Sequence, residues 1–259
     1  IQLFVENAQE AFDTCLQAYR LAEDPAVLTP VMVNLDGFVL SHTEELVDLP
    51  APEEVQAYLP PYQAKYAVDF TNPTTFCFGA TPEVFAEYKY HQQAAMEAAR
   101  QKITDLAVEF EQLFGRNHGG LIKEYSCDDA EYILVTMGSF TGTARVAAQK
   151  LRAMGKKVGV LKVRSFRPFP AHEVARVLAN TKAFGVLDRN YSYGNEGALF
   201  TEIKASLYDY AVRPPGLNFI GGLGGRDIRL DEFEAMFTKL EQAAREPGTV
   251  KAVNFIGLR

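Results

Sequence analysis

Asp188, Arg189 and Asn190 follow one another at the end of an apolar run, before a loop with two glycines and two tyrosines and then an amphipathic stretch. In α/β proteins, binding sites form where a buried strand ends and the chain turns toward a helix. The rings of Tyr191 and Tyr193 could flank a flat ligand or a partner's surface there. An Asp–Arg ion pair that only locks the loop explains the same residues, so both interpretations stay open.

Asp36 and His42 belong to a second polar stretch, DGFVLSH, which also follows an apolar run. A histidine near a carboxylate can act as a general base, although such a histidine is more often structural and simply hydrogen-bonded. No serine or cysteine accompanies the pair in the context of a hydrolase nucleophile. The stretch therefore gives little support to a hydrolytic triad.

Two glycine-rich turns could approach a ligand closely. GSFTGT at 138–143 could hold an anion at a helix N-terminus, but it lacks the Lys-Ser/Thr of a P-loop and the spacing of a dinucleotide fingerprint. A capped tight turn is the favoured interpretation of that stretch. GGLGGRD at 221–227 contains Gly224 and Arg226 and fits a ligand cradle or a subunit contact equally well, with Asp227 as a possible N-cap of the next helix.

Composition excludes several classes of protein. The 259 residues carry a net charge of -7, so no basic surplus exists for binding nucleic acid. The three cysteines form no CxxC pair, and we expect no metal or iron–sulfur site made by this chain alone. No apolar run approaches the ~20 residues that cross a bilayer, and the first residues do not show the charged and then apolar pattern of a signal peptide. We expect a protein of the reducing cytoplasm that does not contact a membrane.

The first part of the chain predicts a strand, a helix and a second strand. Residues 1–5 form an apolar run, and Asn7 with Glu10 is a capping pattern for a helix over 8–22. The helical spacing of apolar side chains predicts that Phe12, Cys15, Leu16 and Tyr19 face the core. The run VMVNL at 31–35 predicts a strand that is covered on both faces.

A proline-rich stretch and a long helix come next. Residues 46–82 hold few periodic segments and predict an ordered arm that lies on a partner's surface. Residues 83–114 predict one long helix that ends at Gly115 and serves as a strut or connector. Its expected apolar stripe consists of Met96, Ile103, Leu106, Phe110 and Leu113.

The rest of the chain alternates apolar runs with amphipathic stretches. We expect strands in YILVTMGS, KVGVLKVRSF, AFGVLD and GLNFIGG, and helices over 141–154, 171–179, 198–210 and 229–244. In the first of these helices Val146, Ala147, Leu151 and Met154 should face inward. The alternation predicts a mostly parallel sheet with helices on both faces, and two domains, 1–124 and 125–259. The strand-like opening IQLFV suggests the rear part of a longer polypeptide.

Four segments carry a family resemblance that covers nearly the whole chain. They are VMVNLDGFVLSHTEELVDLP, LVTMGSFTGTARVAAQKLRAMGKKVGVLKVRSFRPFP, GVLDRNYSYGNEGALFTEIKASLYD and FIGGLGGRDI. Together and in this order they resemble the alpha subunit of pyruvate:ferredoxin oxidoreductase, in the wider group of thiamine diphosphate-dependent 2-oxoacid:ferredoxin oxidoreductases. The form NLDGFVLSH is similar to the pyruvate branch of that group.

The resemblance implies an α/β fold. The rear part of a pyrimidine-side thiamine-binding domain should be followed by a doubly wound domain like the C-terminal domain of transketolase. It also implies an enzyme of anaerobic metabolism that converts pyruvate, coenzyme A and oxidised ferredoxin to acetyl-CoA, carbon dioxide and reduced ferredoxin. Thiamine diphosphate with Mg and [4Fe-4S] clusters would be held mainly by other subunits, namely a thiamine-binding beta, a gamma and a ferredoxin-like delta chain. This chain alone would hold no cofactor and would be inactive.

The resemblance assigns no catalytic residue to this chain, because the family's cofactor-activating glutamate would lie upstream of Ile1. It leaves cleft or interface candidates, which are Asp36, His42, Asp188, Arg189, Asn190, Tyr193, Gly224 and Arg226. Two alternatives stay open. The chain could be a non-catalytic assembly module of such a complex, or a paralogue that acts on oxalate or another 2-oxoacid.

Overall fold

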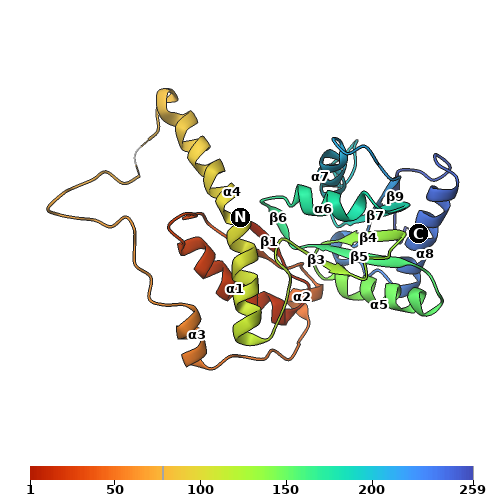
Figure 1. Cartoon of the computed structure of the whole chain (residues 1–259), viewed down its shortest axis with the longest axis horizontal. Coiled ribbons are helices and arrows are strands. Elements are labelled where there is room, and N and C mark those ends of the chain that lie inside the picture. Colours follow the sequence, from red (N-terminus) through yellow and green to blue (C-terminus); the bar gives the residue numbers. More distant parts are fainter. Residues whose placement is uncertain (78, 259) are drawn as a thin grey trace.

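The computed structural model describes residues 1–77 and 79–258 and arranges them around two β-sheets that lie side by side (Figure 1). The first unit surrounds a three-stranded sheet, and the second unit surrounds a six-stranded sheet. The first part of the chain forms β1 (Gln2–Phe4), α1 (Ala8–Glu23), β2 (Met32–Asn34), α2 (Val39–His42), α3 (Pro52–Tyr58) and α4 (Pro82–Phe114).

The second part of the chain alternates strands and helices, as its sequence predicts. It forms β3 (Ile122–Tyr125), β4 (Tyr132–Thr136), α5 (Phe140–Ala153), β5 (Val158–Val163), β6 (Ser165–Arg167), α6 (Ala171–Leu178), β7 (Ala183–Asp188), α7 (Ala198–Leu207), β8 (Gly216–Ile220), the short 3-10 helix η1 (Leu223–Gly225), α8 (Leu230–Arg245) and β9 (Val253–Phe255).

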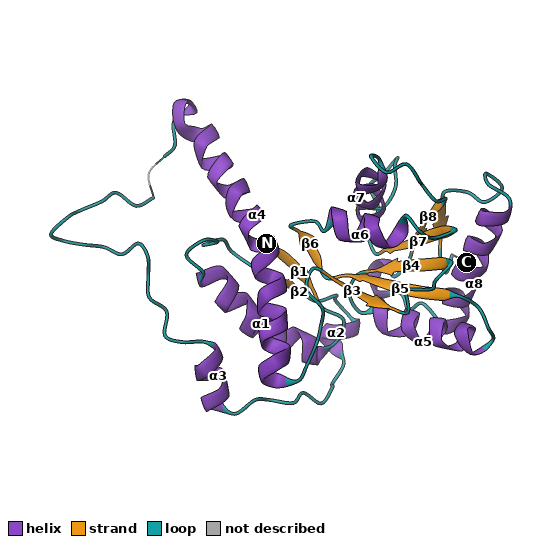
Figure 2. Cartoon of the chain, viewed as in Figure 1, coloured by secondary structure: helices purple, strands orange, loops and turns teal. Residues whose placement is uncertain are grey.

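The six-stranded sheet has the order β3-β5-β4-β7-β8-β9, and all its pairs are parallel except β3 with β5. Every residue of β5 and β7 is buried, because helices cover both faces of the sheet. Helices α5 and α8 pack together on one face, and α6 and α7 pack together on the other (Figure 2). The doubly wound arrangement is therefore confirmed.

Strand β6 joins the first sheet, whose order is β2-β1-β6. It pairs antiparallel with β1, while β2 pairs parallel with β1. The first sheet thus takes one of its three strands from the second part of the chain. Strand β3 spans Ile122–Tyr125, so a limit between 124 and 125 would fall inside a strand. The division into domains 1–124 and 125–259 stays a prediction.

Helix α1 forms where the sequence predicts it, and the side chain of Asn7 accepts a hydrogen bond from the backbone N–H of Glu10 at 2.8 Å. The prediction of its buried face is wrong. Cys15 and Tyr19 are exposed, and Tyr19 retains 64% of its accessible surface. The buried face is mostly polar and consists of Glu10, Asp13, Thr14, Gln17, Ala18 and Leu21.

Strand β2 is an edge strand and is not covered on both faces as predicted. It lies at the edge of the sheet beside β1. Met32 is 56% exposed, and Leu35, which directly follows the strand, is 50% exposed. Two predicted inward faces also need correction. Val146 and Met154 of the α5 region are exposed, as is Leu113 of α4, while Ala147, Leu151, Ile103, Leu106 and Phe110 are buried as expected.

The proline-rich stretch contains a short helix and an extended arm. Helix α3 packs Tyr58 against Phe110 and Phe114 of α4, with ring centroids 5.4 and 5.7 Å apart. All described residues from 60 to 94 are exposed, so the arm and the first third of α4 project away from the rest of the first unit (Figure 1). Helix α4 ends at Gly115 in the left-handed conformation, as predicted.

Two further observations complete the fold. Helix α8 begins at Leu230 with Arg229 at its N-cap position, so Asp227 does not cap it. Among the described residues, none of the helices combines the length and the apolar character that a bilayer span requires.

Candidate functional site

The carboxyl ends of β4 and β7 lie where the connections of two neighbouring strands of the second sheet diverge. The helix that follows β4 packs on one face of the sheet, and the helix that follows β7 packs on the opposite face. Neighbouring parallel strands whose connections diverge in this way leave a crevice in which α/β proteins bind ligands. Ser139 lies just beyond β4, and Arg189 lies just beyond β7.

Asp36 reaches into this crevice from the first unit. Its Oδ2 atom accepts hydrogen bonds from the hydroxyl group of Ser139 and from the guanidinium group of Arg189. Arg189 also donates to the Ser139 hydroxyl at 3.1 Å, so the three side chains form a closed triangle. The side chain of Asp36 is 10% exposed and that of Arg189 is 25% exposed. The structure therefore unites three stretches that the sequence singled out separately.

The glycine loop makes a contact between the two units. A Cβ atom on Gly225 would lie 2.5 Å from Cδ2 of Phe38, so only a glycine allows this approach. Gly224 has a φ of 64° and open space around it. Arg226 points toward the C-terminal segment, where its guanidinium group donates to the carbonyl oxygen of Gly257.

His42 and Tyr193 lie outside the triangle. The His42 ring is exposed, with Nδ1 2.7 Å from the Ser41 hydroxyl and the ring stacked on Phe38 at 5.4 Å. Tyr193 is 96% exposed and meets the edge of Tyr191 at 5.7 Å. Both residues remain candidates for contact with a partner.

The Asp188 carboxylate caps helix α7. Asp188 is 2% exposed, and its carboxylate accepts the backbone N–H groups of Leu199 at 3.0 Å and Phe200 at 3.3 Å. The side-chain amide of Asn218 donates to it at 2.8 Å. Asn190 accepts the backbone N–H of Ala198 at 3.0 Å, so two of the three residues in the Asp-Arg-Asn triplet hold the start of α7.

Burial raises the pKa of Asp188 to about 6, although its hydrogen bonds from Leu199, Asn218 and Phe200 act in the opposite direction. A Cβ atom on Gly197 would lie 2.2 Å from the Asp188 carboxyl carbon, so the helix start is closed tightly over the carboxylate. The carboxylate therefore has no room to reach a ligand in the crevice.

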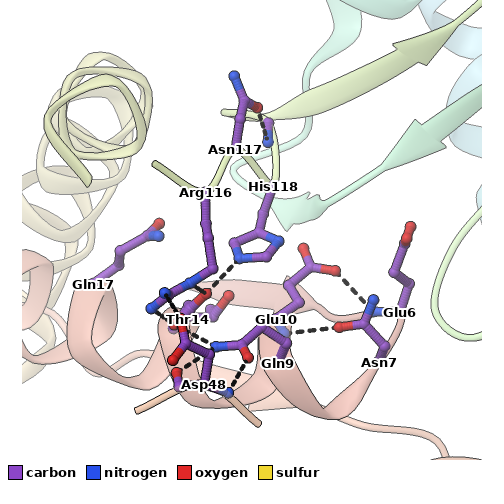
Figure 3. Close-up of polar contacts among 12 residues, drawn as sticks. Glu6, Asn7, Gln9, Glu10, Thr14, Gln17, Asp48, Arg116, Asn117 and His118 are labelled. Atoms are coloured by element: carbon purple, nitrogen blue, oxygen red, sulfur yellow. Dashed lines mark hydrogen bonds and ion pairs between the residues drawn. The ribbon is translucent and has the colours of Figure 1, made fainter. Parts of the chain in front are cut away.

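A buried network of charges joins the two units, and sequence reasoning missed it (Figure 3 shows its part on α1). Lys162 of β5 is 2.5 Å from the Glu10 carboxylate and 3.2 Å from that of Glu6. Arg164 is 3.3 Å from the Glu10 carboxylate and is fully buried. Burial alone would raise the pKa of Glu10, but Lys162 and Arg164 outweigh burial and lower it.

The network continues along α1 to the linker between the units (Figure 3). The buried carboxylate of Asp13 binds Arg116 at 2.8 Å and His118 Nε2 at 2.7 Å. Burial opposes the ionised form, yet the hydrogen bonds from His118 and Arg116 lower the pKa of Asp13. The sequence did hold a signal for this network, because Glu10, Asp13 and Gln17 recur at the spacing of one helix face.

Within the ranges 1–77 and 79–258, no group of three or more His, Cys, Asp or Glu side chains could hold a metal ion. The buried carboxylates of Glu6, Glu10 and Asp13 are all held by cations. These carboxylates are positioned to join structural elements rather than to move protons.

Two family models cover most of the chain. Residues 1–107 match the model described as pyruvate flavodoxin/ferredoxin oxidoreductase, thiamine diphosphate-binding. Residues 130–233 match pyruvate:ferredoxin oxidoreductase core domain II. The two models follow each other in the order that the sequence resemblance implies.

Curated relatives match over nearly the whole chain. The chain is 44% identical over 253 residues to pyruvate synthase subunit PorA of Methanosarcina barkeri, which is 97% of this chain and 63% of the relative. It is 43% identical to PorA of Methanothermobacter thermautotrophicus, over 100% of this chain and 65% of the relative. Ketoisovalerate oxidoreductase subunit VorA of Pyrococcus abyssi is 42% identical over 91% of this chain and 60% of its own length. The chain thus spans less than two thirds of the length of these relatives.

A solved structure supports the fold. The 2-oxoglutarate:ferredoxin oxidoreductase of Magnetococcus marinus matches 94% of this chain and 42% of its own chain, with a TM-score of 0.57 and 15% sequence identity. The fold, the two family models and the identity over nearly the whole chain agree with the expectation from the sequence motifs. The chain belongs to the 2-oxoacid:ferredoxin oxidoreductase family.

Proposed function

We propose that this chain is part of the alpha subunit of a pyruvate:ferredoxin oxidoreductase. The assembled enzyme would convert pyruvate, coenzyme A and oxidised ferredoxin to acetyl-CoA, carbon dioxide and reduced ferredoxin. The observation that carries this proposal is the 44% and 43% identity to two pyruvate synthase subunits along essentially the entire chain. The paired models for a thiamine diphosphate-binding domain and core domain II point to the same reaction class.

The assembled enzyme would use thiamine diphosphate with Mg and iron–sulfur clusters, held mainly by other subunits. Bound thiamine diphosphate would supply the chemistry for decarboxylating a 2-oxoacid. The partners would be a thiamine-binding beta chain, a gamma chain and a ferredoxin-like delta chain, together with ferredoxin and coenzyme A. The enzyme would work in the cytoplasm.

The part played by this chain would be to build and position the frame around the cleft. Its charged clusters join the two units, and its buried carboxylates are engaged by cations. Asp36 and Arg189 meet where the two units touch, so they would shape the cleft wall by positioning.

Exposed apolar surface supports contact with further polypeptide. Helix α1 and strand β2 frame an open hollow of about 400 Å³ lined by Cys15, Ala18, Tyr19, Ala22, Val31 and Val33. The arm adds Phe70, which is 93% exposed. Apolar patches of this kind mark interaction sites on soluble proteins.

The substrate can be tested on the complex co-expressed from all its chains. We expect reduction of ferredoxin with pyruvate to have a kcat/KM at least about tenfold above that with 2-oxoisovalerate, 2-oxoglutarate or oxalate. Because the chain is 42% identical to a ketoisovalerate oxidoreductase subunit, 2-oxoisovalerate is the most informative alternative substrate to compare with pyruvate. A higher kcat/KM for any of these acids would contradict the proposal for pyruvate while leaving the reaction class intact.

A second candidate is a non-catalytic assembly module, which the exposed arm and the cation-bound carboxylates favour. Arg189→Ala in the complex separates the two roles. Slower turnover with unchanged subunit composition indicates positioning at the cleft, whereas lost assembly with normal turnover of the remaining complex indicates an assembly role. We expect the isolated 259-residue chain to show no turnover and negligible thiamine diphosphate binding, and measurable turnover would refute this expectation.

A further inference from the structure

We propose that Ser139 and Arg189, at the ends of β4 and β7, form a binding site for a small carboxylate, and that its resident ligand is the chain's own Asp36. The donors belong to the second unit, whereas Asp36 belongs to the loop after β2, which lies 153 residues before Arg189 in the sequence. The loop thus brings its carboxylate to Ser139 and Arg189 of the second unit as a separate ligand would. This role does not depend on the proposed oxidoreductase activity.

The donors suit a carboxylate. The guanidinium group of Arg189 presents a planar fork of N–H groups that matches a carboxylate, and the hydroxyl of Ser139 adds a further donor. Ser139 stands at the N-cap position of α5, a helix of 14 residues whose positive end favours an anion.

The donors are also held in place without the ligand. The guanidinium group of Arg189 lies over the ring of Phe140, 3.9 Å from its centroid. A Cβ atom on Gly222 would lie 2.2 Å from Phe140 Cζ and 3.2 Å from Arg189 Nε, so a glycine there lets the ring and the cation pack closely. A cation fixed in this way loses little freedom when it binds an anion.

The resident carboxylate leaves part of its own bonding capacity unused. Oδ2 of Asp36 takes the hydrogen bonds from both donors, while Oδ1 is buried without a hydrogen-bond partner among the described residues. The Asp36 side chain is 10% exposed and is attached to the backbone of its loop. A free carboxylate has no such tether and can offer both oxygens to the Arg189 fork.

Occupancy of the crevice would fix the loop of the first unit on the second unit. Two residues after Asp36, Phe38 packs on Gly225, and the ring of His42 stacks on Phe38. Removal of the Asp36 carboxylate should therefore release the loop and leave the crevice open to formate.

Hydrogen exchange on the assembled protein tests the site. In Asp36→Ala we expect backbone exchange in segments 37–45 and 138–146 to rise by about tenfold. Formate, titrated to 50 mM at constant ionic strength set with chloride, should then slow exchange in segment 138–146 by at least about threefold and in a saturable manner. The wild type should show no formate response, because its crevice is filled.

Two controls make the test decisive. Asp36→Ala with Arg189→Gln should not respond to formate, and Asp69→Ala, a change on the exposed arm, should behave as the wild type. A missing formate response in Asp36→Ala, or an equal response in the wild type or the double variant, would overturn the proposal. If Asp36→Ala fails to assemble, Arg189→Gln alone must raise exchange in segment 37–45 by at least about threefold. Unchanged protection of that segment would also overturn it.

Discussion

Asp188 shows at the scale of one residue how burial and hydrogen bonding compete. Three hydrogen-bond donors at the start of α7 and on β8 stabilise its ionised form, yet the carboxyl group is 2% exposed and burial dominates, raising its pKa to about 6. A carboxyl group whose pKa is higher in the folded than in the unfolded state stabilises the fold when protonated. Its contribution is complete below the unfolded value of 3.8 and is lost as the pH rises through about 6.

Asp188→Asn tests this sign. The asparagine cannot titrate. The free energy of unfolding of the wild type, relative to that of the variant, should therefore rise as the pH falls from 7 to 4. The rise of the Asp188 pKa from 3.8 to about 6 corresponds to a change of up to about 3 kcal/mol in this difference. Urea denaturation at pH 4, 5, 6 and 7 measures it.

The other buried carboxylates provide the control. The pKa values of Glu10 and Asp13 are lowered, so their contributions are present at neutral pH and are lost as the pH falls. The wild type and Asp188→Asn share the titration of Glu10 and Asp13, so its effect cancels when the two proteins are compared. If the stability of the wild type relative to Asp188→Asn falls toward pH 4, the helix-capping hydrogen bonds prevail over burial at Asp188.

Helix α1 shows at the scale of one element what the sequence can and cannot specify. Its limits were predictable, because Asn7 supplies the cap and Asp24 with Pro25 ends the helix. Its orientation was not predictable from apolar spacing. The helix has a polar and an apolar face, and the polar face turns inward because Lys162 and Arg164 of the second unit neutralise it. Those partners lie about 150 residues away in the sequence.

Helix α4 divides into a part that stabilises the fold and a part that does not. Phe110 is fully buried against Tyr58 and Phe114, so Phe110→Ala should lower the free energy of unfolding by about 3–5 kcal/mol. Phe70→Ala on the arm that precedes the helix, where the ring is 93% exposed, should change it by less than about 0.5 kcal/mol. Chemical denaturation of both variants measures this. Similar losses would show that the arm packs on the fold.

The strands of the second unit were the most predictable elements. β5 and β7 are apolar except for Lys162 and Asp188, and their burial is expected of strands that have helices on both faces of the sheet. The candidate site was only partly predictable. Asp36 and Arg189 were recognised as polar residues at strand ends, but their pairing depends on how the two units meet. No periodic pattern within either stretch encodes that contact.

At the scale of the whole molecule, buried ions rather than apolar contacts hold α1 to the second unit. Glu10→Gln leaves Arg164 buried without its carboxylate and Lys162 with Glu6 alone, and we expect a loss of about 3–5 kcal/mol in the free energy of unfolding. Replacing the pair together, as Glu10→Gln with Lys162→Met, should recover more than half of the loss, because one uncompensated charge is removed.

A surface pair provides the matched control for this prediction. Arg229 and Asp231 are 3.0 Å apart with side chains 70% and 68% exposed, so Asp231→Asn should cost less than about 0.5 kcal/mol. Denaturant titrations compare the variants. An effect of Glu10→Gln as small as that of Asp231→Asn would show that the network is not needed for stability.

Strand β6, which joins the first sheet from the second part of the chain, determines how this protein would tolerate a break in its backbone. β6 completes the first sheet by pairing with β1, and the linker after α4 supplies Arg116 and His118 to Asp13. A nick near residue 120 would leave one fragment with a bare strand edge and the other with a strand that fits it. Dividing the gene at this point would therefore yield two fragments that require co-expression. They would reassemble by adding β6 of one fragment to the edge of β1 in the other.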